Sequence, residues 1–292
     1  MNNISHDNLS IATTITVFII FVIFIIVVCF QSNSDVSIRK SPKIYGTFIT
    51  LNDIDIYLIN LDRHDNRLAS FVDMYTNSDL ASKPFNRLRA FDASKLDVKP
   101  YVADYAYNEI MTVEKNKYRT KHYQMTKGGV GCFLSHLGVY NNLMATNKQY
   151  ALIFEDDANF DKNIFRDIQL AMEQIPADWD IALFGCKCLS CSDNIDLTWD
   201  KVNRFFCLHC YLISRKCAQK LLKNINMIDQ QIDSYLSDLA GEGNINIYCL
   251  KKPIAVQGLF KSSIQVPIEY SWDINPMELR NPLLEATTQN SP

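Results

Sequence analysis

The stretch YALIFEDD, residues 150–157, indicates what kind of fold this chain adopts. Five uncharged and mostly apolar residues precede three carboxylates, and no polar residues alternate with them, which is typical of a β-strand that is buried on both faces. Such strands belong to parallel sheets, and ligands bind beyond the carboxyl ends of these strands. The sequence therefore places Glu155, Asp156 and Asp157 at a sheet edge where a ligand site is expected.

Other parts of the chain repeat the pattern of buried strand and amphipathic helix. Residues 54–61 (IDIYLINL) form a second apolar run, and further strands are expected at residues 89–92, 179–184, 205–213, 245–250 and 254–257. Helical spacing of apolar residues occurs at residues 67–72, 133–144, 164–175 and 218–225. Residues 94–127 show no firm period and are interpreted as a long, partly helical loop. This alternation predicts an α/β fold with a mainly parallel sheet and helices on both faces.

The N-terminal region has the composition of a membrane anchor. Residues 11–30 are nearly all Ile, Val and Phe, and no charged residue occurs between Asp7 and Asp35. About 20 apolar residues are enough to cross a bilayer as a helix. A cleaved signal peptide is disfavoured because no basic residue precedes the run and no clear Ala-x-Ala site follows it. One transmembrane helix is therefore expected before the α/β fold.

The expected organisation is an N-terminal tail (1–10), a transmembrane anchor (11–30), a stem (31–50), one α/β domain large enough for an enzyme (51–270) and a C-terminal tail (271–292). The basic residues after the anchor favour a cytosolic domain by the positive-inside rule. A net charge of −3 in 292 residues gives no electrostatic reason to expect a nucleic-acid partner.

Cysteine is abundant, with nine residues in the chain. The spacing of Cys188, Cys191, Cys207 and Cys210 matches a four-thiolate zinc site. However, Cys207 and Cys210 fall in a predicted strand, where positions three apart point to opposite faces. Buried apolar cysteines or disulfide partners are therefore favoured over zinc.

Three adjacent carboxylates after a buried strand repel one another. Two charges 4 Å apart repel by about 4 kcal/mol at the effective dielectric near a protein surface. A divalent cation such as Mg²⁺ or Mn²⁺ would turn this repulsion into attraction and would also bind phosphate oxygens. The alternative is a solvated turn in which one carboxylate caps the helix that starts near Asn163.

Eight segments of the chain resemble glycosyltransferase family 25, the lipooligosaccharide and collagen galactosyltransferase type. They are IYLINLDRHDNRL (56–68), AFDAS (90–94), GGVGCFLSHLGVY (128–140), YALIFEDDA (150–158), DWDIALFG (178–185), HCYLISRKCAQKLL (209–222), IDSYL (232–236) and KKPIAVQ (251–257). The resemblance implies a GT-A-like (Rossmann-like) fold, a nucleotide-diphospho-sugar donor, usually a UDP-hexose, and commonly Mn²⁺, with Mg²⁺ as the alternative.

The resemblance also implies roles for the acidic residues. Glu155, Asp156 and Asp157 stand where GT-A enzymes keep an Asp-x-Asp motif, with Glu in place of the first Asp. By this analogy Asp157 binds the metal, Asp156 contacts the nucleotide-sugar, and Glu155 faces the ribose or the sugar as a catalytic residue. His209 is the expected second metal ligand, and an ordinary strand histidine is the alternative.

The remaining candidate nucleotide-sugar-binding residues come from three of the other segments. They are Asn60, Asp62, Arg63 and Arg67 of the first block, Asp92, and the pair Ser135 and His136. Arg67 could instead be a surface helix residue. Ser135 and His136 are expected near the start of a helix, where backbone N–H groups attract anions, and a core histidine is the alternative for His136.

Since the family is classed as inverting, a carboxylate base is expected to assist the acceptor hydroxyl. Asp233 is the preferred base, with Asp229 and Asp238 as competitors and helix capping as the structural alternative. The predicted function is transfer of a hexose, galactose or glucose, from a UDP-sugar to a glycan, lipooligosaccharide or hydroxylysine-type acceptor. A catalytically degenerate, membrane-tethered binding protein is the alternative. Anchored glycosyltransferases of the secretory pathway normally face the lumen, so a luminal and a cytosolic domain are both open.

Overall fold

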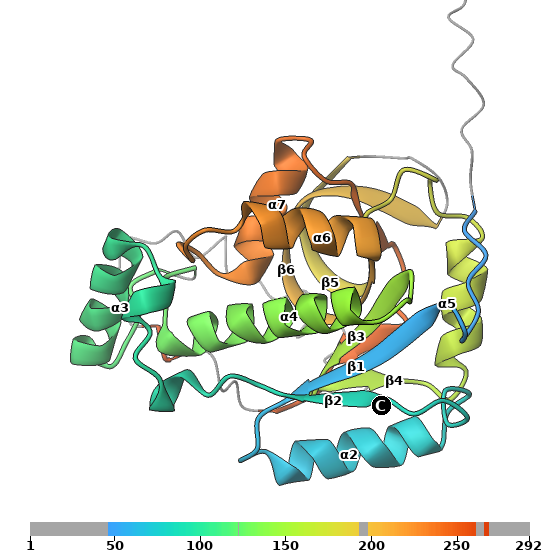
Figure 1. Ribbon diagram of the computed structural model, residues 1–292, viewed down its shortest axis with the longest axis horizontal. Coiled ribbons are helices and arrows are strands. Elements are labelled where there is room, and N and C mark those ends of the chain that lie inside the picture. Colours follow the sequence, from blue (N-terminus) through green and yellow to red (C-terminus); the bar gives the residue numbers. More distant parts are fainter. Residues whose placement is uncertain (1–45, 122, 193–197, 261–265, 269–292) are drawn as a thin grey trace, which may run out of the picture. The chain divides into compact units, whose positions relative to one another are not determined.

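The computed structural model describes residues 46–121, 123–192, 198–260 and 266–268 (Figure 1). The predicted membrane anchor at residues 11–30 and the predicted tails at 1–10 and 271–292 lie outside these residues. Within the residues that are described, no helix combines the length and the apolar character needed to cross a bilayer.

A mixed sheet forms the centre of the fold. In the described part of the chain it has six strands in the order β2-β1-β3-β6-β5-β7. Their bounds are β1 Ile54–Asn60, β2 Asn86–Arg89, β3 Tyr150–Glu155, β5 Ile181–Ser192, β6 Trp199–Ser214 and β7 Ile247–Leu250. β1 is parallel to β2 and β3, and β5 is parallel to β7, whereas β6 is antiparallel to β3, β5 and β7. The mainly parallel sheet is therefore confirmed, with β6 as the reversed strand.

The reversal of β6 follows from its short connection to β5. Only residues 193–198 separate the two strands, and a parallel crossover needs a dozen residues or more. The strand predicted at residues 179–184 is wrong at its C-terminal end, because β5 continues to Ser192 and pairs along its length with β6 through several register shifts. The outer half of β5 is polar and lacks the apolar run of a buried strand. Its hydrogen bonds to the antiparallel β6 stabilise it as a strand.

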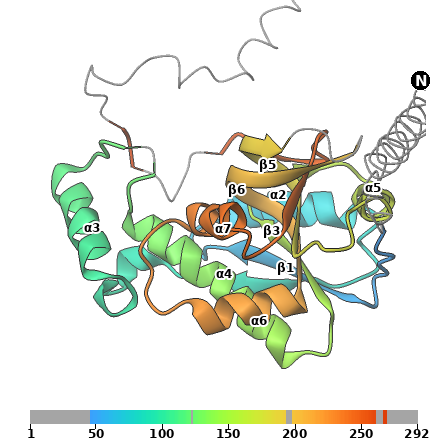
Figure 2. The ribbon, with the colours of Figure 1, turned by 90° about the horizontal axis from the view of Figure 1, so that it is seen from above.

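Helices cover both faces of the sheet, as predicted (Figures 1 and 2). On one face, α4 (Lys127–Ala145), α6 (Arg215–Asn224) and α7 (Ile232–Gly241) pack against alternate strand residues such as Tyr57 and Ile59. On the other face, α2 (Asp65–Thr76) and α5 (Ile164–Met172) pack against Ile56 and Leu58. Each central strand is thus buried on both sides, which explains its unbroken apolar sequence.

Two further features border the carboxyl ends of the strands. The segment expected to be a partly helical loop contains the short turns η1 (Ala93–Lys95) and η2 (Lys99–Tyr101) and the helix α3 (Asp104–Asn116). Both views place α3 beside the N-terminal end of α4 (Figures 1 and 2). The short strands β4 (Ala158–Phe160) and β8 (Ala255–Gln257) pair antiparallel and bring residue 257 next to residue 157.

Candidate functional site at the carboxyl ends of β1 to β3

A cavity of about 320 Å³ opens where β1, β2 and β3 end. Residues that follow these strands form most of its wall, and the first residues of α4 complete it. The predicted site residues in its lining are Arg63, Arg67, Asp92, Ser135, Glu155, Asp156 and Asp157. Asn60, Asp62, His136, His209 and Asp233 do not line it. The cavity therefore collects the acidic row and part of the first block, as expected for a ligand site at this edge.

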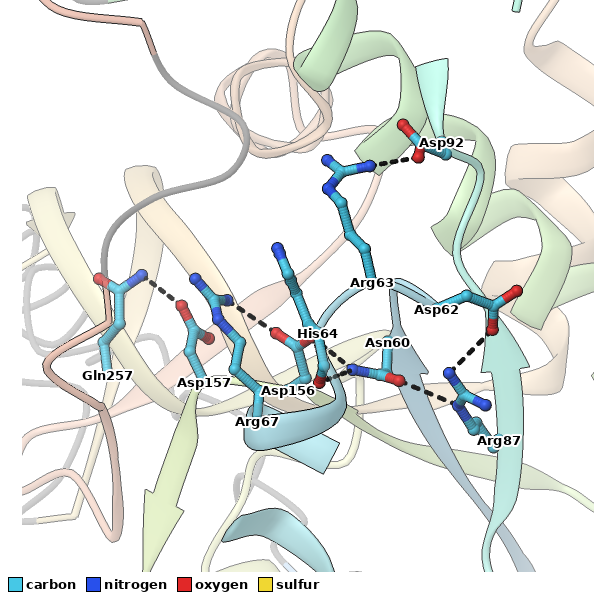
Figure 3. Close-up of polar contacts among 10 residues, drawn as sticks. All are labelled: Asn60, Asp62, Arg63, His64, Arg67, Arg87, Asp92, Asp156, Asp157 and Gln257. Atoms are coloured by element: carbon cyan, nitrogen blue, oxygen red, sulfur yellow. Dashed lines mark hydrogen bonds and ion pairs between the residues drawn. The ribbon is translucent and has the colours of Figure 1, made fainter. Parts of the chain in front are cut away.

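Asp156 is the centre of a buried polar network (Figure 3). Arg67 Nη1 donates to Asp156 Oδ1 at 2.8 Å, and Asn60 Nδ2 donates to Asp156 Oδ2 at 2.7 Å. Asn60 Oδ1 in turn accepts from Arg87 Nε at 2.9 Å, and Asn60 Nδ2 also reaches the backbone oxygen of His64. Since both oxygens of Asp156 already have donors, this carboxylate connects β3 to β1 and α2. Arg67 is a buried partner of Asp156 and not a surface helix residue.

Glu155 is held from the helix side of the sheet. His136 Nε2 lies 3.1 Å from Glu155 Oε1, and His136 Nδ1 lies 2.8 Å from the hydroxyl of Tyr211, which contacts the hydroxyl of Tyr140 at 2.9 Å. Burial raises the pKa of Glu155, but the hydrogen bond and charge of His136, with smaller contributions from other cations, lower it overall below its ordinary value. Glu155 is therefore an oriented and ionised carboxylate at the cavity wall.

Asp157 has one oxygen that lacks a partner. Gln257 Nε2 donates to Asp157 Oδ2 at 2.9 Å (Figure 3). Asp157 Oδ1 is buried and has no hydrogen-bond partner among the described residues. Burial, followed by the charge of Glu155, raises the pKa of Asp157 to about 6. Of the three acids, Asp157 thus has the greatest need for a positive group that the protein itself does not supply.

Cationic and amide groups face the acids across the cavity. Arg63 forms an ion pair with Asp92, and the hydrogen bond from Arg63 is the largest cause that lowers the pKa of Asp92 to about 2. Lys127 and Gly128 contribute the first residues of α4 to the wall. A helix N-terminus has unsatisfied N–H groups and a partial positive charge, so this end of the cavity suits an anion.

The predicted placement of Ser135 and His136 at a helix start is wrong. α4 begins at Lys127, where the side chain of Thr126 caps it by accepting from Gly129 N at 2.9 Å. The glycines at 128, 129 and 131 precede the helical spacing predicted at residues 133–144, yet they lie inside this helix. At Gly131 a Cβ would come within 2.3 Å of the carbonyl oxygen of Phe91, so glycine permits close packing there. His136 is a fully buried core histidine in the middle of α4.

Ser135 and Asp62 make contacts that support the structure. Ser135 Oγ accepts from Phe91 N at 2.9 Å and donates to Gly131 O at 2.6 Å, which ties α4 to the segment after β2. Asp62 is mostly exposed, and its Oδ1 accepts from Arg87 Nη2 at 2.9 Å on β2. Both residues hold the cavity wall in place, and Ser135 also contributes to the lining.

His209 is buried on β6 next to β8. Its Nε2 lies 3.2 Å from the carbonyl oxygen of Ala255, and its Nδ1 is buried without a partner among the described residues. Gly185 makes room for this contact, because a Cβ there would come within 2.0 Å of Ala255 O and 2.3 Å of His209 Nε2. A histidine whose other ring nitrogen binds a backbone carbonyl is the form that ligates metals.

The two predicted metal ligands do not form a ready-made cluster. Within the described ranges, the groups of three or more candidate ligand atoms that lie within 4.8 Å of one another are Cys132–His136–Glu155 and Cys188–Cys191–Cys249. Neither contains Asp157 or His209. In the first group both ring nitrogens of His136 already have hydrogen-bond partners. The orphaned oxygen of Asp157 is therefore the feature of this site that fits a cation best.

Asp233 lies in the first turn of α7, outside the cavity lining. Its Oδ2 accepts from Cys207 N at 3.3 Å, and its Oδ1 accepts from Ser234 N at 2.9 Å. Cys207 has a left-handed backbone conformation with φ 72°, and the hydrogen bond to Asp233 stabilises this conformation in β6. Burial raises the pKa of Asp233. The two competing acids already have hydrogen-bond partners: the half-buried Asp229 accepts from the hydroxyl of Tyr105, and the exposed Asp238 accepts from Gln230 Nε2.

Several residues of the cavity were not predicted. They are Thr126, Lys127 and Gly128 at the start of α4, Glu114 on α3, Val266, and Gln257 on β8. A Thr that directly precedes an apolar helical pattern is a recognisable N-cap, so the first three had a signal in the sequence. Gln257 is the last residue of the matching segment KKPIAVQ, but its contact with Asp157 depends on the pairing of β4 with β8.

The zinc alternative for the cysteines is wrong. Cys188 and Cys191 are joined by a disulfide, so neither offers a thiolate. Cys207 is half-buried near Gln257, and Cys210 is fully buried in the core on the α2 side. The disulfide and buried-cysteine interpretation is the one that the structure supports.

Comparison with known proteins gives the family. The family model described as "Glycosyltransferase family 25 (LPS biosynthesis protein)" matches residues 53–236, which is more than half of the chain. The chain belongs to glycosyltransferase family 25. The matched range contains β1, β3, α4 and the N-terminal part of α7, and hence every predicted site residue.

Family 25 proteins from animals are among the curated relatives that match. Procollagen galactosyltransferase 1 of Danio rerio is 26% identical over 138 residues, covering 46% of this chain and 21% of that protein. A glycosyltransferase 25 family member of Aedes aegypti is 28% identical over 177 residues, covering 58% and 28%. Inactive glycosyltransferase 25 family member 3 of Homo sapiens is 38% identical over 66 residues, covering 22% and 11%. The chain thus spans less than a third of each relative's length.

Proposed function

We propose that this family 25 protein is an inverting, metal-dependent hexosyltransferase that uses a UDP-sugar donor. Family membership supports glycosyl transfer. The observation that carries the donor side is the cavity at the ends of β1 to β3, where acids and cationic groups face the same space. Galactose is the preferred hexose and glucose the alternative. The proposed acceptor is a hydroxyl of a glycan, a lipooligosaccharide or a hydroxylysine, in keeping with a family description that refers to LPS biosynthesis and a relative named as a procollagen galactosyltransferase.

The diphosphate of the donor is proposed to bind at the N-terminal end of α4. The first N–H groups of a helix have no intrahelical acceptor, and its dipole favours negative charge. Lys127 adds a full positive charge at this position, and Arg63 lies in the wall of the same cavity. This assignment replaces the anion-binding role that was predicted for Ser135 and His136.

Mn²⁺ or Mg²⁺ is proposed to bind at Asp157. The buried Oδ1 without a partner and the raised pKa of Asp157 fit a cation ligand. His209 has an unpaired buried Nδ1 and remains the proposed second ligand. A bound divalent cation would act as a Lewis acid that stabilises charge on the departing diphosphate. Asp156, with both oxygens occupied, is proposed to position this site without ligating the metal.

The acceptor side depends on two carboxylates. Glu155 lines the cavity and is kept in one orientation by His136, so it is proposed to face the transferred sugar. Asp233 is the proposed general base, because burial raises its pKa and thereby brings it nearer to the range in which a base works well. Asp233→Asn tests the base, and it should lower turnover of the acceptor reaction while leaving UDP binding intact.

The proposed reaction is tested by a donor screen. The full chain is incubated with individual UDP-hexoses, with Mn²⁺ or with EDTA, and UDP release is measured. We expect release with one UDP-hexose, and we expect both EDTA and Asp157→Ala to abolish it. Asp167→Ala is the matched control, because Asp167 is a carboxylate of α5 that pairs with the exposed Arg166. Full turnover by Asp157→Ala would remove Asp157 from the mechanism.

A binding protein without catalytic turnover is the second candidate. The human relative that matches with 38% identity is named inactive, which favours this possibility for part of the family. Titration calorimetry with UDP, combined with the donor screen, distinguishes the two functions, since a degenerate protein binds UDP but releases none from any UDP-sugar. The proposed membrane anchor at residues 11–30 is tested separately by alkaline extraction. Protease protection then decides between a luminal and a cytosolic catalytic domain.

A further inference from the structure

Four cysteines gather at the outer half of β5, away from the cavity. Cys186, Cys188 and Cys191 lie on β5, and Cys249 lies on β7, which pairs with β5. None of the four lines the cavity, and the proposed transfer reaction uses none of them. The pairing of β5 with β6 shifts register between Cys188 and Cys191, and this irregularity lets two residues three apart bring their sulfurs together.

A free thiol contacts the disulfide of this cluster. Cys188 and Cys191 are bonded to each other, and Cys249 Sγ lies 3.9 Å from Cys191 Sγ. The sulfur atoms of all three residues lie within 4.8 Å of one another. Cys188 is exposed, Cys191 is half-buried and Cys249 is buried, so the cluster leads from the surface into the interior.

Cys186, the fourth cysteine of the cluster, affects the pKa of the Cys249 thiol. The neighbouring thiol of Cys186 is the largest cause that lowers the pKa of Cys249 below the ordinary range of a thiol. The Cys249 thiol, together with burial, raises the pKa of Cys186. The lowered pKa favours the thiolate form of Cys249, the thiol that also contacts the disulfide. The thiolate is the form that attacks disulfides.

We propose that Cys249 and the Cys188–Cys191 disulfide form a thiol–disulfide exchange site that opens the surface disulfide from the inside. In this step the Cys249 sulfur attacks Cys191 Sγ, the Cys191–Cys249 bond forms, and the Cys188–Cys191 bond breaks. Cys188 leaves as a thiolate and takes up the proton that Cys249 has given up, so the number of disulfides is unchanged and no outside oxidant or reductant is needed. The product ties β5 to β7 and presents the Cys188 thiol to solvent.

The exposed thiol gives the first test. The native full chain, without reductant, is incubated with a maleimide, and labelled cysteines are mapped by mass spectrometry after acid quenching. We expect Cys188 to become labelled in the wild type, because the label traps each molecule that has isomerised. In Cys249→Ser the internal nucleophile is missing and this labelling should be lost. Absence of label on Cys188 in the wild type, or equal labelling in Cys249→Ser, overturns the proposal.

A second variant tests the new bond directly. Cys188→Ser is treated with oxidised glutathione, which converts the Cys191 thiol to a mixed disulfide, and Cys249 should then displace glutathione to give a Cys191–Cys249 crosslink. Cys207→Ser serves as the control, since Cys207 lies near Gln257 and not in the cluster, and its wild-type disulfide map should be retained. A mixed disulfide that persists at Cys191, or pairing of Cys191 with Cys207, contradicts the exchange.

Discussion

The replacement Asp156→Asn is expected to destabilise the fold far more than its small size suggests. Asp156 accepts from Arg67 through one oxygen and from Asn60 through the other, and it is only 8% exposed. The amide of Asn60 cannot turn around without losing the bond from Arg87 to its oxygen. An asparagine at position 156 therefore directs its NH₂ group at a donor in either orientation, toward the guanidinium of Arg67 or toward the amide of Asn60.

The magnitude follows from the burial of the pair. Removing one partner of a buried ion pair costs about 3–5 kcal/mol, because the remaining charge is left uncompensated. Asparagine retains one of the two hydrogen bonds, so we expect a loss of about 3 kcal/mol in the free energy of unfolding. Urea unfolding measures this loss as a lower midpoint at an unchanged m-value. The exposed pair of Arg166 and Asp167 is the control, and Asp167→Asn should stay within about 0.5 kcal/mol of the wild type.

A double-mutant cycle separates this explanation from a general packing defect. Arg67→Met removes the other partner, and the double variant should be less destabilised than the sum of the single variants, with a coupling energy of about 1–3 kcal/mol. The reasoning is refuted if Asp156→Asn loses less than about 1 kcal/mol, or if the two losses simply add.

Three further predictions concern one residue of the cavity wall and two residues that support the site from outside it. Arg63→Met should raise the pKa of Asp92 from about 2 toward 3.8, and NMR titration of the Asp92 carboxyl measures this change. Because the pKa of Asp92 is lower in the folded protein than in the unfolded chain, its ionisation stabilises the wild-type fold. The wild type loses this stabilisation as the pH falls from about 4 toward 2, and the variant loses less. Gly185→Ala should destabilise by about 1–3 kcal/mol in urea unfolding, because its Cβ would lie 2.0 Å from a carbonyl oxygen of β8. His136→Phe should lower UDP release by about 10- to 100-fold, because it frees Glu155 from its orienting hydrogen bond.

Matched variants control these predictions. Gly241→Ala places a Cβ no closer than 3.8 Å to a neighbouring atom and should leave stability unchanged. Tyr140→Phe removes a hydroxyl that contacts Tyr211 and not Glu155, so UDP release should stay near that of the wild type. An unmoved Asp92 pKa in Arg63→Met, wild-type stability in Gly185→Ala, or full UDP release in His136→Phe would each contradict the corresponding argument.

The central strands could be predicted from sequence because their burial is local information. β1 and β3 lie where the unbroken apolar runs predict them, since a strand covered on both faces needs apolar residues at every position. The length of β5 and the direction of β6 could not be predicted in the same way. The outer half of β5, with Lys187 and Ser190, is held by its pairing with β6 and not by its own apolar character.

The site was predictable where strand ends bring residues together. Asn60 and Asp156 are 96 residues apart, yet they end parallel neighbours and share a hydrogen bond. What each side chain does there was not predictable, because roles depend on partners that come from other elements. Gln257 reaches Asp157 only through the pairing of β4 with β8, and His136 reaches Glu155 only because α4 begins at Lys127, well before the Ser-His pair.

The structure explains how three adjacent acids coexist at one sheet edge. β3 ends at Glu155, and Asp156 and Asp157 lie in the turn that follows, so the three carboxylates have different neighbours. Glu155 receives its compensation from His136, and Asp156 receives it from Arg67 and Asn60. Asp157 receives a single amide bond and keeps one buried oxygen without a partner. The repulsion expected from the sequence is thus relieved at two positions and concentrated at the third, which is why a divalent cation, if one binds here, should be bound through Asp157.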